Sequence, residues 1–178
     1  VNICQFPFWA LSVYFAYRAL DQNKLIDFVF LGVVLAFGFL SKYLFIYLIL
    51  GIKLAFLFKM IEEKKFNFYY LVPGFIFLIL ISPHLYWLTQ NDFITIQYGL
   101  KRTGETASFL DHIKHPIIFT LKQIGILIPF LVSVFLILDS KKSVLNWSDN
   151  RFKFLFSVTI VPILLVILTS MIMGSKIR

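Results

Sequence analysis

Residues 26–58 read IDFVFLGVVLAFGFLSKYLFIYLILGIKLAFLF, and this stretch decides the fold class. It contains two apolar runs, 26–40 and 43–58, that are separated only by Ser41 and Lys42. A continuous α-helix over the whole stretch would be about 50 Å long, whereas the hydrocarbon core of a bilayer is about 30 Å thick. We therefore predict two membrane-spanning helices that are joined by a tight turn at Ser41 and Lys42.

The rest of the chain repeats this pattern of apolar runs. Further runs, each near the length that a membrane-spanning helix needs, occupy 6–20, 69–88, 116–138 and 152–173. Of the 178 residues, 60% are hydrophobic and 15% are charged, whereas soluble domains have about 45–50% and about 25%. The composition therefore predicts an all-α, polytopic transmembrane helical bundle with about six spans, which forms a single membrane domain over 1–178.

Lysine and arginine are distributed unevenly between the two sides of this predicted bundle. One side carries the larger group, in the connections that follow the first, third and fifth spans: Arg18, Lys24, Lys59, Lys64, Lys65, Lys141, Lys142, Arg151 and Lys153. The other side carries the smaller group: Lys42, Lys101, Arg102, Lys114, Lys176 and Arg178. Cytoplasmic loops of membrane proteins are enriched in Lys and Arg, so the first side is predicted to be cytoplasmic and the second to face outward.

The long connection at 89–115 is the main predicted outer loop. It mixes charged and polar residues with apolar ones such as Phe93 and Ile96, which is typical of an amphipathic segment on the membrane surface. Gly104 follows this segment and favours a turn.

Three cations on the outer side are candidates for chemistry. Lys42 lies between two spans, where it is either an interfacial anchor or a cation that meets a lipid phosphate. Lys101 and Arg102 allow the same two interpretations, and the planar guanidinium of arginine suits phosphate oxygens.

The histidines and the single cysteine limit the metal sites and disulfides that the chain can form. His84, late in the fourth span, is expected to be a hydrogen-bonded histidine of the bundle. His112 and His115 share the spacing of one helical face, which leaves a divalent metal open, although a third ligand would be needed and no metal site or cofactor is assigned. Cys4 has no partner for an internal disulfide. The basic residues form no contiguous face with interleaved aromatics, so nucleic acid is not predicted as a partner.

Four segments together resemble the bacterial glycosyltransferase family 39 proteins, which are related to protein mannosyltransferases and aminoarabinose transferases and share the membrane GT-C fold. The segments are Phe8-Trp9-Ala10-Leu11 with Tyr17-Arg18-Ala19-Leu20; Gly38-Phe39-Leu40-Ser41-Lys42-Tyr43; Pro83 and Trp87 with Gln90-Asn91-Asp92-Phe93, Thr95 and Arg102; and His115-Pro116 with Gln123-Ile124-Gly125 and Pro129. The resemblance extends over nearly the whole chain, and its specificity comes from the order and spacing of the segments.

This resemblance implies a multi-pass enzyme of the bacterial inner membrane and cell envelope. Such an enzyme transfers a sugar from a polyprenyl-phosphate donor to a lipid, glycan or protein acceptor at the outer face. It further implies that cations stabilise the phosphate of the donor, and the candidates for this role are Lys42, Lys101, Arg102, Lys114 and His115. Tyr43 is a further candidate for binding the donor phosphate. The chain is expected to be an internal fragment of such an enzyme, so the catalytic base is expected to lie outside it and no catalytic residue is assigned. The alternatives are a transporter or flippase of a lipid-linked precursor and a non-catalytic membrane subunit.

Overall fold

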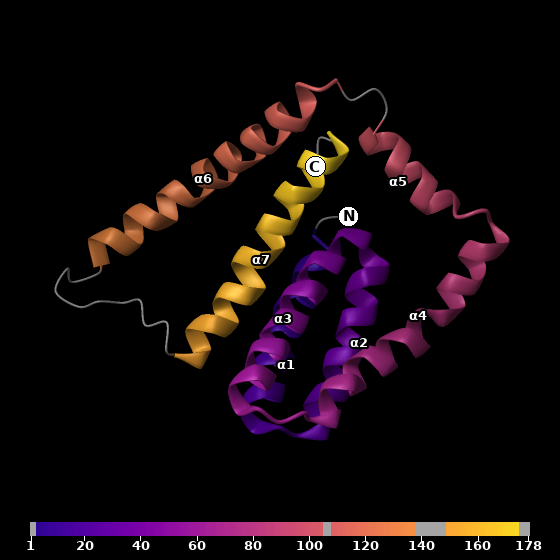
Figure 1. The fold of residues 1–178 in the computed structure, drawn as a ribbon, viewed down its shortest axis with the longest axis vertical. Helices are drawn as coiled ribbons and strands as arrows, with labels where there is room; N and C mark the ends of the chain where they lie inside the picture. Colours follow the sequence, from indigo (N-terminus) through magenta and orange to yellow (C-terminus); the bar gives the residue numbers. More distant parts are fainter. Residues whose placement is uncertain (1–2, 105–107, 138–148, 175–178) are drawn as a thin grey trace. The chain divides into compact units, whose positions relative to one another are not determined.

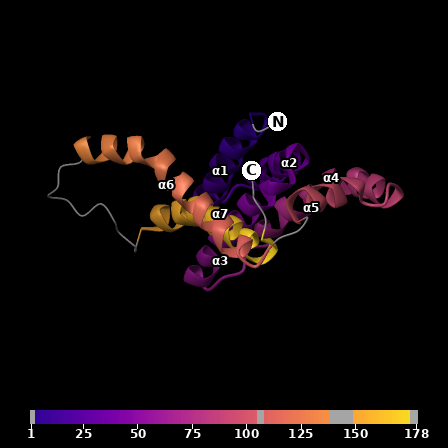
Figure 2. The same cartoon turned by 90° about the horizontal axis from the view of Figure 1, so that it is seen from above.

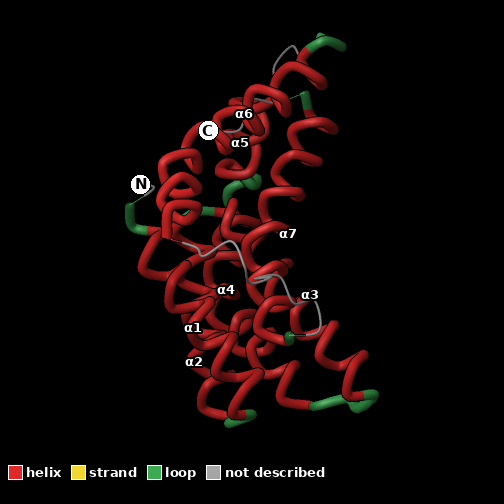
Figure 3. The backbone as a smooth tube through the Cα atoms, turned by 90° about the vertical axis from the view of Figure 1, so that its left-hand side faces the viewer, coloured by secondary structure: helices red, strands yellow, loops and turns green. Residues whose placement is uncertain are grey.

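The computed structural model describes residues 3–104, 108–137 and 149–174, and every regular element in these ranges is helical (Figures 1 and 3). The chain divides into two compact units. Unit 1 comprises Val1–Phe93 with Ser148–Pro162, and unit 2 comprises Ile94–Trp147 with Ile163–Arg178. The predicted all-α class is confirmed.

Unit 1 is built from four long helices that run back and forth. They are α1 (Gln5–Gln22), α2 (Leu25–Ser41), α3 (Ile46–Glu63) and α4 (Val72–Gln90), with the 3-10 helices η1 (Tyr43–Phe45) and η2 (Phe68–Leu71) before α3 and α4. The first part of α7 (Asn150–Met173) also belongs to this unit. Unit 2 contains α5 (Ile94–Gly104), α6 (Asp111–Ile137) and the remainder of α7. Figure 2 gives a second view of the same helices.

The sharp turns between the first helices follow from local backbone geometry. α1 ends because Asn23 adopts a left-handed conformation with φ of 52°, and its N–H donates to Ala19 O. α2 ends because Lys42 is extended, with φ of −163° and ψ of 126°. The predicted break at Ser41 and Lys42 is therefore confirmed, and 26–58 forms two long helices.

The core of unit 1 lies where α1, α2, α3 and α7 meet. Phe28, Leu31, Phe45 and Leu48 are fully buried there. Glycines on two helices permit close approach: a Cβ added at Gly32 would lie 2.9 Å from Pro73 O of α4, and one added at Gly51 would lie 2.6 Å from Ser157 O of α7. Small residues at such crossings are typical of membrane helices, because packing drives their association.

Four helical segments are long and apolar enough to cross a membrane. They are Tyr43–Glu63, Phe68–Gln90, Asp111–Leu136 and Asn150–Met173, and Leu25–Ser41 is a shorter apolar helix. These segments correspond to the predicted spans 43–58, 69–88, 116–138, 152–173 and 26–40. The predicted span 6–20 lies within α1, where its role as a span stays a prediction.

The predicted loop at 89–115 contains more helix than a loop would. Its proposed surface segment forms α5, which ends at Gly104. α6 then begins at Asp111, five residues before the predicted span, and the carboxylate of Asp111 accepts a hydrogen bond from Ser108 N at 2.9 Å. A carboxylate in the first turn is favourable for a helix, which explains the early start.

The two ends of unit 1 differ in charge. Figure 1 shows the α1–α2 and α3–α4 connections at one end of this unit, which we call the basic end. It holds Arg18, Lys24, Lys59, Lys64 and Lys65, together with Arg151 and Lys153 from the start of α7. The α2–η1 turn lies at the opposite end and carries Lys42. Lys141 and Lys142, which the sequence assigns to the basic side, lie outside the described residues.

Candidate functional site

The turn that carries Lys42 is held by backbone hydrogen bonds on both sides of this residue. Lys42 N donates to Gly38 O at 3.3 Å, and Phe45 N donates to Lys42 O at 2.9 Å. The hydroxyl group of Ser41 also donates to Gly38 O, at 2.6 Å. These bonds fix the backbone of Lys42 at the end of the bundle, where its half-buried side chain starts from a defined position.

Tyr43 connects this turn to α4. The Tyr43 hydroxyl oxygen lies 2.7 Å from Nε2 of His84, and the two ring centroids are 5.9 Å apart. The imidazole of His84 also stacks on Trp87, with 6.0 Å between centroids and 14° between ring planes. We call Lys42, Tyr43, His84 and Trp87 the Lys42 corner.

Aromatic side chains of neighbouring helices pack against the Lys42 corner. The ring of Phe39 lies 5.2 Å from that of Tyr43 and 5.6 Å from that of Phe77, so it bridges η1 and α4. Phe45 is fully buried and meets Trp9 of α1 edge-on, with 5.7 Å between centroids. The corner therefore rests on three helices, while Trp87 keeps 45% of its surface exposed.

The other predicted phosphate ligands belong to unit 2. Lys101 and Arg102 lie in the last part of α5, and Lys114 is exposed near the start of α6. His115 is half-buried, and its Nε2 lies 3.5 Å from Oδ1 of Asp111. Lys42 and Tyr43, which are neighbours in the sequence, therefore lie in unit 1, and the remaining four candidates lie in unit 2.

The histidines of the chain have separate environments. His84 is hydrogen-bonded within the bundle, as predicted. His112 Nδ1 lies 2.6 Å from Met171 O, whereas His115 faces Asp111. Within 3–104, 108–137 and 149–174, no three His, Cys, Asp or Glu side chains are grouped to hold a metal ion.

The pairing of His84 with Tyr43 is the site feature that sequence reasoning missed. The two residues are 41 positions apart, and no local motif connects them. The one available signal was that both residues fall at the same end of two predicted spans.

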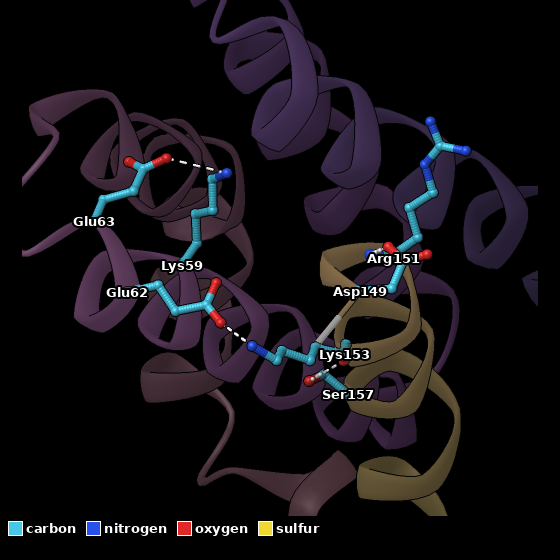
Figure 4. A network of polar contacts seen from close by, with 7 residues as sticks. All are labelled: Lys59, Glu62, Glu63, Asp149, Arg151, Lys153 and Ser157. Atoms are coloured by element: carbon cyan, nitrogen blue, oxygen red, sulfur yellow. Dashed lines mark hydrogen bonds and ion pairs between the residues drawn. The ribbon is translucent and has the colours of Figure 1, made fainter. Parts of the chain in front are cut away.

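A network of charged side chains occupies the basic end of unit 1 (Figure 4). Lys153 of α7 pairs with Glu62 of α3, and Lys59 lies 3.0 Å from Glu63. These pairs border a cavity of about 330 Å³ between the ends of α1 and α3 and the start of α7. Its lining holds three acidic residues, Asp21, Glu62 and Asp149, and three basic residues, Lys59, Arg151 and Lys153, so its charges balance and it has no net attraction for phosphate.

The comparison with known families identifies the part of the chain that holds the Lys42 corner. Residues 1–87 match the model of the dolichyl-phosphate-mannose-protein mannosyltransferase family, and all four corner residues lie within this match. No match was found among curated proteins or among solved structures. The helical membrane character and the match agree with the resemblance in the sequence. This match over residues 1–87 indicates a membrane glycosyltransferase of the GT-C type.

Proposed function

We propose that this protein transfers a sugar from a polyprenyl-phosphate donor to an acceptor at the outer face of the bacterial inner membrane. The observation that carries the proposal is the Lys42 corner. In this corner Lys42 directly precedes Tyr43, whose hydroxyl group is bonded to His84, within residues that match a glycosyltransferase family.

The chemistry of the reaction explains why a cation is needed at this position. When the acceptor attacks the anomeric carbon, the bond from that carbon to the phosphate oxygen breaks, and negative charge develops on the departing phosphate. A cation that is already in place stabilises this charge more strongly in a water-poor site than in bulk water. We assign this role to Lys42, with the Tyr43 hydroxyl as a second contact.

The distribution of charge in unit 1 supports the orientation of the site. The basic end collects seven lysines and arginines, Arg18, Lys24, Lys59, Lys64, Lys65, Arg151 and Lys153, and such an end is retained in the cytoplasm. The Lys42 corner is at the opposite end of the unit, so we assign it to the outer face. There it would meet the headgroup of a lipid whose chain lies in the bilayer.

Four further candidates lie in unit 2. We propose, from the resemblance in the sequence, that Lys101, Arg102, Lys114 and His115 bind the phosphate of a polyprenyl donor. Lys114 is exposed near the start of α6, so its ammonium group is accessible to a headgroup.

The proposal is tested with membranes that contain the intact protein. They are incubated with a polyprenyl-phosphate hexose labelled in the sugar, and the label is followed into the lipid, glycan and protein fractions. Movement of the label out of the donor, beyond that in membranes without the protein, is expected. Label that stays on the polyprenyl lipid would contradict the proposal. If the labelled lipid instead moves from one leaflet to the other, the result would favour the alternative of a flippase.

A further inference from the structure

The imidazole of His84 is held by two neighbours that together define its orientation. Nε2 is bonded to the Tyr43 hydroxyl at 2.7 Å, and the ring plane lies on Trp87 with a 14° interplanar angle. The hydrogen bond satisfies one ring nitrogen of this half-buried histidine and also links α4 to the turn after α2. Its bonding partner, Tyr43, is the residue next to Lys42 in the turn of the Lys42 corner.

We propose that His84 is a positioning residue of the Lys42 corner, and that its protonation strengthens binding of the donor phosphate. This inference rests on the proposed function, because it takes the phosphate of the polyprenyl donor as the ligand of the corner. We assign to the neutral imidazole the tautomer with its proton on Nδ1, in which Nε2 accepts a hydrogen bond from the Tyr43 hydroxyl group. The imidazolium carries a proton on Nε2 and can only donate it, so the Tyr43 oxygen then accepts.

Protonation therefore redirects the hydroxyl group of Tyr43. Once its oxygen accepts from His84, its own proton is available for an acceptor on the other side, and a phosphate oxygen is such an acceptor. The imidazolium also adds a positive charge at the end of unit 1 that carries Lys42.

Few other charged groups at this end of unit 1 could produce the same pH dependence. In the described part of the unit the charged groups are Lys42 on the α2–η1 turn and Asp92 directly after α4. The further titratable groups are Cys4 before α1, Tyr43 in η1, Tyr47 at the start of α3 and Tyr86 on α4. Lysine, aspartate, cysteine and tyrosine ordinarily titrate near pH 10.4, 3.9, 8.5 and 10, whereas histidine titrates near pH 6.5. A change between about pH 5.5 and 7.5 is therefore the signature of a histidine.

The test is the KM for a polyprenyl-phosphate hexose, measured with the intact protein from pH 5.5 to 7.5. For the unaltered protein, KM should rise by about ten-fold as the pH increases, the factor that corresponds to losing one charge-assisted hydrogen bond. His84→Gln keeps a neutral hydrogen-bonding group, so its KM should stay at the high value throughout this range. His112→Gln is the matched control, because His112 binds Met171 O in unit 2, and it should keep the dependence on pH.

The outcomes separate this inference from the proposed function. If the unaltered protein transfers sugar but His84→Gln retains the same pH dependence, the positioning role of His84 is wrong and the transferase stands. If the unaltered protein transfers no sugar, both are wrong. Should His84→Gln fail to fold, Tyr43→Phe removes only one oxygen and should raise KM mainly at low pH. An unchanged KM profile for Tyr43→Phe would overturn the inference.

Discussion

The hydroxyl group of Tyr43 lies 2.7 Å from Nε2 of His84, so the turn after α2 is bonded to the last third of α4. This bond joins two segments of the family-matched region that are 41 positions apart. It lies at the end of unit 1 where Lys42 is fixed by its backbone bonds to Gly38 and Phe45. The geometry of the Lys42 corner therefore depends on the packing of α2 against α4.

Removing this bond should measurably weaken unit 1. Tyr43→Phe deletes the hydroxyl and leaves His84 without its partner, so we expect a loss of about 1 kcal/mol in the free energy of unfolding. The measurement is reversible unfolding by SDS in mixed micelles. Tyr86→Phe is the control, because Tyr86 lies on the same helix with 69% of its surface exposed. Equal stability of the two variants would show that the bond contributes nothing.

Gly38 should tolerate no larger side chain, because a Cβ at this position would collide with the ring of Phe45. That ring is fully buried and cannot move without opening the core. Gly38→Ala should therefore destabilise the protein by about 1–3 kcal/mol, as overpacking does in other cores. Gly74→Ala on α4 meets nothing within 4 Å and should be neutral or slightly stabilising. Both variants are compared by thermal unfolding in detergent, and a stable Gly38→Ala protein would contradict the observed packing.

The ion pair between Arg18 and Asp27 should hold α1 to α2. Nη2 of Arg18 lies 3.2 Å from Oδ1 of Asp27, whose side chain is only 1% exposed. A double-mutant cycle with Arg18→Ala and Asp27→Ala should give a coupling energy of about 1–3 kcal/mol. The matched pair Lys59 and Glu63 lies on the surface of one helix, and its coupling energy should stay below about 0.5 kcal/mol. Similar coupling in the two pairs would show that burial does not strengthen the first.

The proposed orientation can be tested with the single cysteine of the chain. Cys4 is exposed next to the start of α1, at the end of unit 1 that also carries Lys42. A membrane-impermeant maleimide added to intact, outer-membrane-permeabilised cells should label it. With Cys4→Ala and Lys65→Cys together, the cysteine is at the basic end and should be labelled only after lysis. The reverse pattern would place the Lys42 corner in the cytoplasm.

The sequence was sufficient to predict the helices and the break between α2 and α3, because the lengths of the apolar runs and the thickness of the bilayer allow few other arrangements of helices. Some predicted helices were several residues shorter than the observed ones. α3 continues past Phe58 to Glu63 through a polar turn in which Lys59 and Glu63 pair. α6 begins at Asp111, where Ser108 and the Asp111 carboxylate are hydrogen-bonded. An apolar window does not detect polar turns of this kind.

The candidate site was predictable only in part, because its residues come from different helices. Lys42 and Tyr43 are neighbours in a turn, and their position between two predicted spans identified them as candidates for the site. His84 joins them only through the packing of α4 beside α2, in which Gly32 allows the close approach of Pro73 and Ile76. Such packing depends on the shapes of side chains on separate helices, and no spacing along the chain encodes it.

The most direct test of the donor site is the effect of Lys42→Ala on sugar transfer by the intact protein. Loss of one charge-assisted contact to phosphate corresponds to about 1.5–3 kcal/mol, so kcat/KM for the polyprenyl-phosphate donor should fall by about ten- to one-hundred-fold. Lys42→Arg should recover part of this loss. Lys64→Ala, which removes a cation from the opposite end of unit 1, should leave kcat/KM unchanged. Equal kcat/KM values for the Lys42→Ala and Lys64→Ala proteins would contradict the assignment of the Lys42 corner to the donor phosphate.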